Sequence, residues 1–273
     1  MTGAAQKPVD FATGALPAAF WLRSAAFFID ADPETGAMIP SAARISRWLE
    51  RFDDWYKLTI GCERTDRLHL LYHRDVTLVG ARFLTHVPQI IEIAETAARC
   101  GVGFSLTVPL DEAMADEDAM MRIVGAKAVS TLAISVEGDD EAPDREQLAR
   151  ILQGVVAAKQ HIAFLGPYDA ISRLGLLDVD GVSSAQITVH PKDGAGPPAI
   201  SQTPVNACFS RLRIYADVTG ELYPCLGLVG VPGARLGAID DAIEDTVFGG
   251  APYALDIDAL ARRGPALTGK APE

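Results

Sequence analysis

The sequence is poor in basic residues and in cysteine, and each shortage narrows the possible functions. Its 273 residues contain 24 Lys and Arg against 36 Asp and Glu, so the formal net charge is −12. Proteins that bind nucleic acids carry a basic surface, and no cluster of Lys or Arg occurs here, so we expect no nucleic-acid partner. The four cysteines favour free thiols or metal ligands over a disulfide framework in a chain of this size; they are Cys62, Cys100, Cys208 and Cys225.

Long apolar runs and the features of a secretory signal are also missing. No segment approaches the roughly 20 apolar residues that a helix needs to span a bilayer. The first residues show no apolar stretch followed by a cleavage site. We therefore expect a cytoplasmic protein with no membrane partner. The glycine patterns that cradle phosphates and the G-x-S-x-G turn of serine hydrolases do not occur either.

The chain has a regular alternation of strand-like and helix-like segments. Strands are predicted at residues 20–29, 76–79, 104–108, 129–136, 162–165 and 185–189, with shorter pieces at 57–61 and 68–72. Helices are predicted at residues 41–52, 87–100, 111–123, 148–156 and 168–174. Alternation of this kind with short connections indicates βαβ units and a parallel sheet.

Composition divides the chain into four parts. Residues 1–19 are rich in Ala, Gly and Pro and form an N-terminal arm, and residues 20–193 hold the six βα units. The Gly/Pro-rich run 194–204 reads as a linker. Residues 205–273 then form a small extension.

The extension begins with a distinctive cysteine spacing. Cys208 is followed by an apolar strand, a polar turn that closes at Gly220, a short strand and Cys225; L-G-A-I follows at 236–239. This arrangement resembles the start of the SPASM/twitch extension of radical SAM enzymes. V-T-L-V-G-A-R-F-L at 76–84 and A-I-S-V-E-G at 133–138 resemble strand ends of that family, in the same order. The resemblance implies a partial (β/α)6 TIM-like barrel of parallel strands with a small C-terminal β-hairpin extension.

The sequence departs from this family where the family holds its cofactors. Radical SAM enzymes bind a [4Fe–4S] cluster through the thiolates of C-x-x-x-C-x-x-C, and thiolate ligation is what retains such clusters. The motif is absent, and the loop at 30–40 has no cysteine. Where the family has the G-G-E-P that binds the amino group of SAM, this sequence has V-G-A-R, and Arg82 would repel an ammonium group. The departures imply that the chain does not cleave SAM, and we expect neither SAM nor an intact radical SAM cluster as a cofactor.

Two residual metal sites stay open as alternatives. A SPASM or twitch cluster needs at least three cysteines, and only Cys208 and Cys225 occur after residue 200. They form either a remnant hairpin of reduced thiols or a residual iron–sulfur cluster that another ligand completes. Cys62, Asp66 and His69 repeat the spacing of the missing motif. This is either chance or a site for a single metal ion, because such ligands suit zinc or iron.

Polar residues at the ends of the predicted strands mark a candidate substrate pocket. Active sites of α/β barrels lie at the C-terminal ends of the strands. Residues of this kind follow four of the predicted strands: Asp30, Asp32, Arg82, Ser135, Glu137, His190 and Lys192. We predict that they line one mouth of the barrel, and the alternative is ordinary polarity of solvated loops. His86, near another element end, is expected to be a surface or capping group.

Three functional hypotheses follow. The first is a catalytically degenerate radical SAM/SPASM-like protein, a binding or accessory partner in the maturation of a peptide or peptide-derived cofactor. Its partner would be a peptide or protein, such as an intact modification enzyme. The second is a metal- or iron–sulfur-dependent enzyme on the same barrel, using either of the two residual metal sites. The third is an unrelated α/β barrel in which the cysteine spacing is a coincidence.

Overall fold

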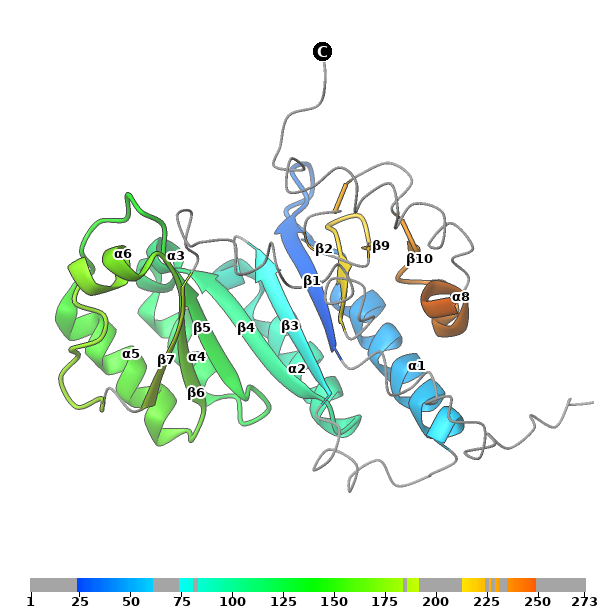
Figure 1. Cartoon of the computed structure of the whole chain (residues 1–273), viewed down its shortest axis with the longest axis horizontal. Helices are drawn as coiled ribbons and strands as arrows, with labels where there is room; N and C mark the ends of the chain where they lie inside the picture. The colour runs from blue at the N-terminus through cyan, green and yellow to red at the C-terminus, as the bar shows by residue number, and fades with distance from the viewer. Residues whose placement is uncertain are drawn as a thin grey trace, which may run out of the picture.

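The computed structural model describes residues 24–60, 74–80, 83–183, 186–191, 213–223, 226, 229–230 and 235–248. Within these residues the chain folds into one mixed sheet with helices (Figure 1). Six strands pair in parallel in the order in which they occur along the chain. They are β1 (Ser24–Ala31), β3 (Asp75–Gly80), β4 (Gly103–Pro109), β5 (Thr131–Ser135), β6 (His161–Gly166) and β7 (Ile187–Pro191).

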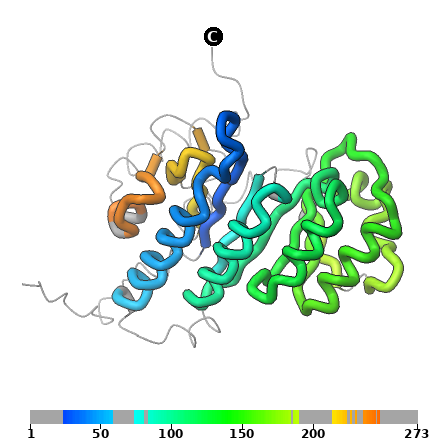
Figure 2. The backbone as a smooth tube through the Cα atoms, turned by 180° about the vertical axis from the view of Figure 1, so that it is seen from behind, coloured from blue at the N-terminus to red at the C-terminus, as the bar shows by residue number. Residues whose placement is uncertain are grey.

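Helical segments connect these strands. The longer helices are α1 (Ala42–Ile60), α2 (Val87–Arg99), α4 (Glu117–Gly125) and α5 (Arg145–Ala157). Figure 2 shows these four helices side by side over one face of the sheet. The shorter segments are the 3-10 helix η4 (Phe83–His86), α3 (Leu110–Ala115) and α6 (Tyr168–Arg173). The predicted order of βα units is therefore confirmed. No helix in the described ranges is long and apolar enough to cross a membrane.

The sheet is open. Its strand order is β10-β9-β8-β1-β3-β4-β5-β6-β7, and β2 (Met38–Ile39) pairs antiparallel with the end of β1. In the ranges that the structure describes, β7 and β10 are the two outer strands, and they do not pair with each other. The mixed α/β class and the mostly parallel sheet agree with the prediction, but the described strands do not close a barrel.

The C-terminal hairpin is continuous with this sheet. β8 (Arg213–Ala216) lies parallel to β1, and β9 (Glu221–Tyr223) returns antiparallel to β8. The turn between them closes at Gly220, whose φ of +88° suits glycine. β10 (Gly237–Ala238) pairs with β9, and α8 (Ile243–Phe248) packs against α1.

Two predictions about helices are wrong. Residues 57–60 were predicted as part of a strand but continue α1, because the aromatic residues Trp48, Phe52 and Trp55 keep the helical spacing and stack. Lys57 also pairs with Asp53 one turn earlier. The helix predicted at 111–123 is two helices, α3 and α4. Asp116 separates them, and its side chain caps α4 by accepting a hydrogen bond from the N–H of Ala119.

Candidate functional site

The two faces of the sheet differ in chemistry because side chains alternate along each strand. Residues paired across parallel strands point to the same face, so the register identifies each face. The face toward the helices is apolar and buried, as in the row Phe27, Leu78, Leu106, Leu132 and Ile162. The next row on the opposite face is small and polar, and it contains Ala26, Thr77, Ser105 and Thr131.

We call this second surface the polar face. It comprises the alternate residues of β1, β3, β4, β5 and β8: Ser24, Ala26, Phe28, Asp75, Thr77, Val79, Ser105, Thr107, Thr131, Ala133, Ser135, Arg213 and Tyr215. Hydroxyl groups from three neighbouring strands therefore point the same way. Sequence analysis did not identify this surface, because it considered polar residues only at the ends of the strands. The alternation of Thr and Ser with Leu, Ile and Val in β3, β4 and β5 was the available signal.

Asp30 and Asp32 lie where β1 ends, as predicted, but their carboxylates serve the local backbone. Asp30 accepts a hydrogen bond from the N–H of Ala31 at 2.7 Å. Asp32 accepts from the N–H groups of Thr35 and Glu34 at 2.8 and 2.9 Å. These backbone hydrogen bonds, that of Thr35 first, lower the pKa of Asp32. Asp32 thus holds the turn that leads into β2.

Ser135 and Glu137 lie at the end of β5, also at the predicted edge. Glu137 is exposed, and its N–H donates to the carboxylate of Asp140 at 2.6 Å. β1 and β5 are separated by β3 and β4, so Ser135 is about 14 Å from Asp30 across the sheet. The structure places the two groups along one edge without bringing them together.

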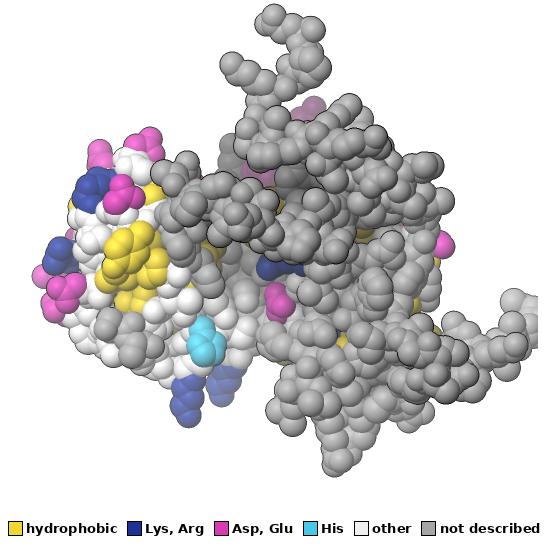
Figure 3. Space-filling view, in the orientation of Figure 1, with side chains coloured by type: hydrophobic (Ala, Val, Ile, Leu, Met, Phe, Trp, Pro, Cys, Tyr) yellow, Lys and Arg dark blue, Asp and Glu magenta, His cyan; other side chains and the backbone are white. Residues whose placement is uncertain are grey.

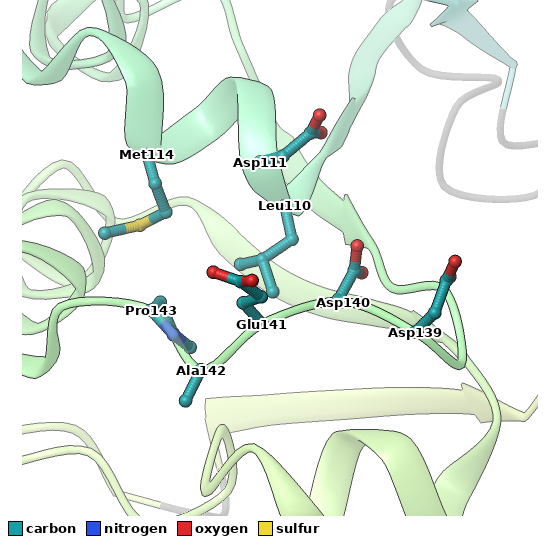
Figure 4. A pocket seen from close by; sticks show the side chains of 8 residues that line it. All are labelled: Leu110, Asp111, Met114, Asp139, Asp140, Glu141, Ala142 and Pro143. Atoms are coloured by element: carbon teal, nitrogen blue, oxygen red, sulfur yellow. The ribbon is translucent and has the colours of Figure 1, made fainter.

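An acidic loop follows β5 and borders a cavity of about 430 Å³. The cavity lies between this loop and α3, and Figure 4 shows Leu110 and Met114 of α3 beside the side chain of Glu141. Acidic side chains also gather at this end of the molecule in Figure 3. The remaining lining residues are Asp111, Asp139, Asp140, Ala142 and Pro143.

The other predicted site residues are not placed by the described part of the chain. Arg82, Lys192, Cys208 and Cys225 lie outside it, as do Cys62, Asp66 and His69. The backbone of His190 is in β7, where its Cα pairs with Leu165 of β6, and its side chain is outside the described set.

His86 is a feature that sequence analysis assigned wrongly. It is 4% exposed instead of lying on the surface, and it makes no capping hydrogen bond to α2. Its Nε2 atom has no hydrogen-bond partner. Burial lowers the pKa of His86, and the negative charge of Asp30 opposes that shift. A buried imidazole with an unused nitrogen therefore lies at the same edge of the sheet as Asp30.

The residues that the structure describes do not fit an iron–sulfur cluster at the end of β1. Neither the turn that follows β1 nor the strand β2 contains a cysteine. The described thiol is Cys100, which is buried at the end of α2, before β4 begins. Burial raises its pKa to about 11, so it is a poor source of a thiolate ligand. The described residues also contain no group of three or more His, Cys, Asp or Glu that could hold a metal ion.

Comparison with known proteins finds similarity in structure only. No protein-family profile matches the sequence, and no curated protein is similar to it in sequence. SuiB from Streptococcus suis, bound to S-adenosylmethionine, matches with a TM-score of 0.54 and 10% identity over 86% of this chain and 67% of SuiB.

SuiB bound to its precursor peptide SuiA gives a TM-score of 0.52 and 8% identity over 86% of this chain and 66% of that one. BtrN in complex with AdoMet and 2-DOIA gives a TM-score of 0.47 and 8% identity over 88% of this chain and 86% of BtrN. At these identities the SuiB matches concern the fold alone. The chain therefore shares the fold of SuiB.

Proposed function

We propose that this chain is a degenerate radical SAM-like protein that binds a peptide on its polar face and assists the maturation of that peptide or of a peptide-derived cofactor. The observation that carries the proposal is the set of small hydroxyl side chains on neighbouring strands, Thr77, Ser105 and Thr131. An apolar sheet face would have to be covered by further core. Ser105 and Thr131 are partly exposed and can be reached by an extended chain, whereas Thr77 is buried beside them.

The chemistry of the polar face suits a peptide. The backbone of an extended peptide presents N–H and C=O groups that lose water on binding and need new partners. Hydroxyls both donate and accept hydrogen bonds, so Ser and Thr can serve either group. The fold likeness to SuiB, one structure of which contains a precursor peptide, supports the same class of ligand.

The proposal that the protein is degenerate rests on the metal-ligating atoms that its sequence offers. The sequence has no C-x-x-x-C-x-x-C, and the turn after β1 offers carboxylates in place of thiolates. Asp32 is already engaged by two backbone N–H groups. With Arg82 where the family has an acidic contact to SAM, two parts of the cofactor site differ from the family at once.

The first experiment tests the absence of radical SAM chemistry. The full chain is purified anaerobically, reconstituted with iron and sulfide, and incubated with SAM and dithionite. Mass spectrometry then measures 5′-deoxyadenosine. We expect none above the protein-free control, and formation of 5′-deoxyadenosine would overturn the proposal. Retention of iron that is lost on Cys208→Ser or Cys62→Ser would instead favour the metal-dependent enzyme.

The second experiment tests peptide binding. The labelled full chain is applied to an array of 15-residue peptides of random sequence, beside the variants Ser105→Leu and Ala157→Leu. Ser105 is on the polar face, whereas Ala157 is exposed at the end of α5. We expect Ser105→Leu to weaken binding at least tenfold and Ala157→Leu to bind like the wild type. Equal binding by all three proteins would place the peptide elsewhere.

A further inference from the structure

Arg213 reaches across the sheet on the polar face. It begins β8, where its Cα pairs with Ser24 of β1, yet its Nη2 atom donates a hydrogen bond to the hydroxyl of Thr77 on β3 at 2.8 Å. The side chain therefore passes over β1, where Ala26 occupies little space. The guanidinium also lies 5.7 Å from the centre of the Tyr215 ring, two residues along β8. Thr77 and Tyr215 thus hold the guanidinium in one position.

The charge of Arg213 is not neutralised by the described residues. Other arginines of the chain pair with carboxylates, as Arg74 does with Asp53 and Arg44 with Asp240. Arg213 has no such ion pair in the ranges that the structure describes, and its buried Nε has no hydrogen-bond partner. A guanidinium has five N–H donors, so most of them remain available. A partly buried cation with unused donors is costly unless an anion joins it.

We propose that Arg213 and Thr77 form a binding site for a carboxylate of the peptide ligand, which makes the ligand a peptide recognised through an acidic side chain or its C-terminus. This inference rests on the proposed peptide-binding function. The fork of a guanidinium matches the two oxygens of a carboxylate, and such paired hydrogen bonds are short and directional. The hydroxyl of Thr77 fixes the orientation of the fork.

The surroundings favour a carboxylate over a phosphate. Among the residues that make up the polar face, Arg213 is the positively charged one. Asp75 lies in the same row, on the other side of Ser24. The chain as a whole carries a net charge of −12. One guanidinium balances the single negative charge of a carboxylate, whereas a phosphate dianion would keep one uncompensated negative charge in this acidic surrounding.

The test uses the full chain and the peptide array, with each peptide printed in matched forms. One form replaces Asp and Glu by Asn and Gln, and another replaces the free C-terminal carboxylate by an amide. For the peptides that bind, we expect the wild type to prefer the carboxylate form about tenfold or more. The form that loses binding identifies whether the carboxylate belongs to a side chain or to the C-terminus.

The variants assign the preference to the site. Arg213→Gln should bind both peptide forms equally, at the level of the wild type with the neutral form. Arg213→Lys keeps the positive charge but not the paired N–H donors, so it should retain only part of the preference for the carboxylate form. Thr77→Val should weaken this preference. Arg122→Gln, at an exposed position of α4, is the matched control and should leave the preference unchanged. Circular dichroism verifies that each variant is folded.

The outcomes separate the two proposals. A wild type that binds peptides without regard to their carboxylates would overturn the carboxylate site and leave peptide binding intact. A preference that survives in Arg213→Gln would also overturn it. If the wild type binds no peptide on the array, the proposed function and this inference both fail.

Discussion

At the scale of single residues, His86 combines burial with an unpaired nitrogen. Its side chain is almost fully enclosed and Nε2 has no partner. A buried polar atom without a partner costs about 1–3 kcal/mol. A charged imidazole in the same place would cost more, which is why burial lowers the pKa of His86. His86 is therefore a residue through which acid should destabilise the fold.

The prediction for His86 concerns the pH dependence of stability. The unfolded chain takes up a proton near the ordinary pKa of 6.5, whereas the folded chain does so only at lower pH. Below pH 6.5 the unfolded state thus binds more protons, and stability falls as the pH drops. Urea unfolding between pH 7.5 and 5 should show a smaller loss of stability for His86→Leu than for the wild type. Identical pH dependence in the two proteins would contradict the assignment.

Arg74 is a second buried charge, and it is fully satisfied. It is 2% exposed, pairs with Asp53 at 2.9 Å and donates to the carbonyl of Cys100 at 2.7 Å. Its guanidinium also lies 4.7 Å from the centre of the Tyr56 ring. These contacts connect the start of β3 to α1 and to the end of α2.

Arg74→Met should therefore be strongly destabilising, because it removes the buried cationic partner of the Asp53 carboxylate. Removing one partner of a buried pair costs about 3–5 kcal/mol, and we expect the lower end because Lys57 still lies 2.5 Å from Asp53. The free energy of unfolding in urea measures the loss. Arg150→Met breaks the exposed pair with Glu117 and serves as the control, with little change expected. Similar losses in both variants would refute the role of burial.

At the scale of elements, the C-terminal ends of the strands approach one another closely. Gly166 ends β6, and a Cβ there would lie 2.3 Å from the carbonyl oxygen of Val136, just past the end of β5. Gly80 ends β3, and a Cβ there would lie 2.0 Å from the carbonyl oxygen of Ile29 in β1. Both obstacles are backbone atoms, which cannot move aside as a flexible side chain can. These glycines keep the edge of the sheet compact where Asp30 and Ser135 lie.

Gly166→Ala should destabilise the protein because the added methyl group has no space. Overpacking of this kind costs about 1–3 kcal/mol or more. Gly125, the last residue of α4, is the matched control, since nothing lies within 4 Å of the Cβ that alanine would add. Gly125→Ala should be neutral or stabilise by up to about 1 kcal/mol through the unfolded state. Thermal unfolding of the three proteins distinguishes the two effects, and a Gly166→Ala protein as stable as the wild type would contradict the prediction.

The order of strands and helices could be predicted because apolar runs and helical stripes alternate along the chain. The end of α1 could not, because Lys57 to Ile60 reads equally well as a short strand. Only the aromatic stacking of Phe52 and Trp55 within the core settles it. Helix breaks such as Asp116 depend on a single capping side chain. Local pattern thus determines the type of most elements here, and packing determines their ends.

The positions of several predicted pocket residues along the strands could be read from the sequence, but their contacts and the polar face could not. Asp30, Asp32, Ser135 and Glu137 do lie at the C-terminal edge, because parallel strands bring those ends together. Their hydrogen bonds, which commit Asp32 to a turn, depend on backbone geometry that sequence spacing does not contain. The contact between Arg213 and Thr77 joins residues 136 positions apart through the strand order β8-β1-β3. That order arises because the chain, after β7, pairs β8 with β1. The alternation of strands and helices did not indicate this pairing.

At the scale of the whole molecule, the described residues between 213 and 248 hold one side of the main sheet together. β8 covers the edge of β1 that β3 does not use. Ile239 and Ile243 are buried in the common core. Arg44 of α1 pairs with Asp240 at 2.6 Å, and Arg51 donates to the carbonyl groups of Ile239 and Asp240. These contacts are those of a shared core, whereas composition predicted a separate extension after a linker.

A chain that ends at residue 204 should therefore not fold on its own. It loses β8, β9, β10 and α8, which exposes the edge of β1 to pairing with other molecules and the apolar surface of α1 to water. We expect an aggregated or unfolded product, judged by soluble yield, circular dichroism and urea unfolding. A chain that ends at residue 248 keeps every described element and is expected to unfold in one transition. If the shorter chain unfolded cooperatively at the urea midpoint of the full chain, the extension would be a separate domain, and the carboxylate site at Arg213 would bridge two independent units.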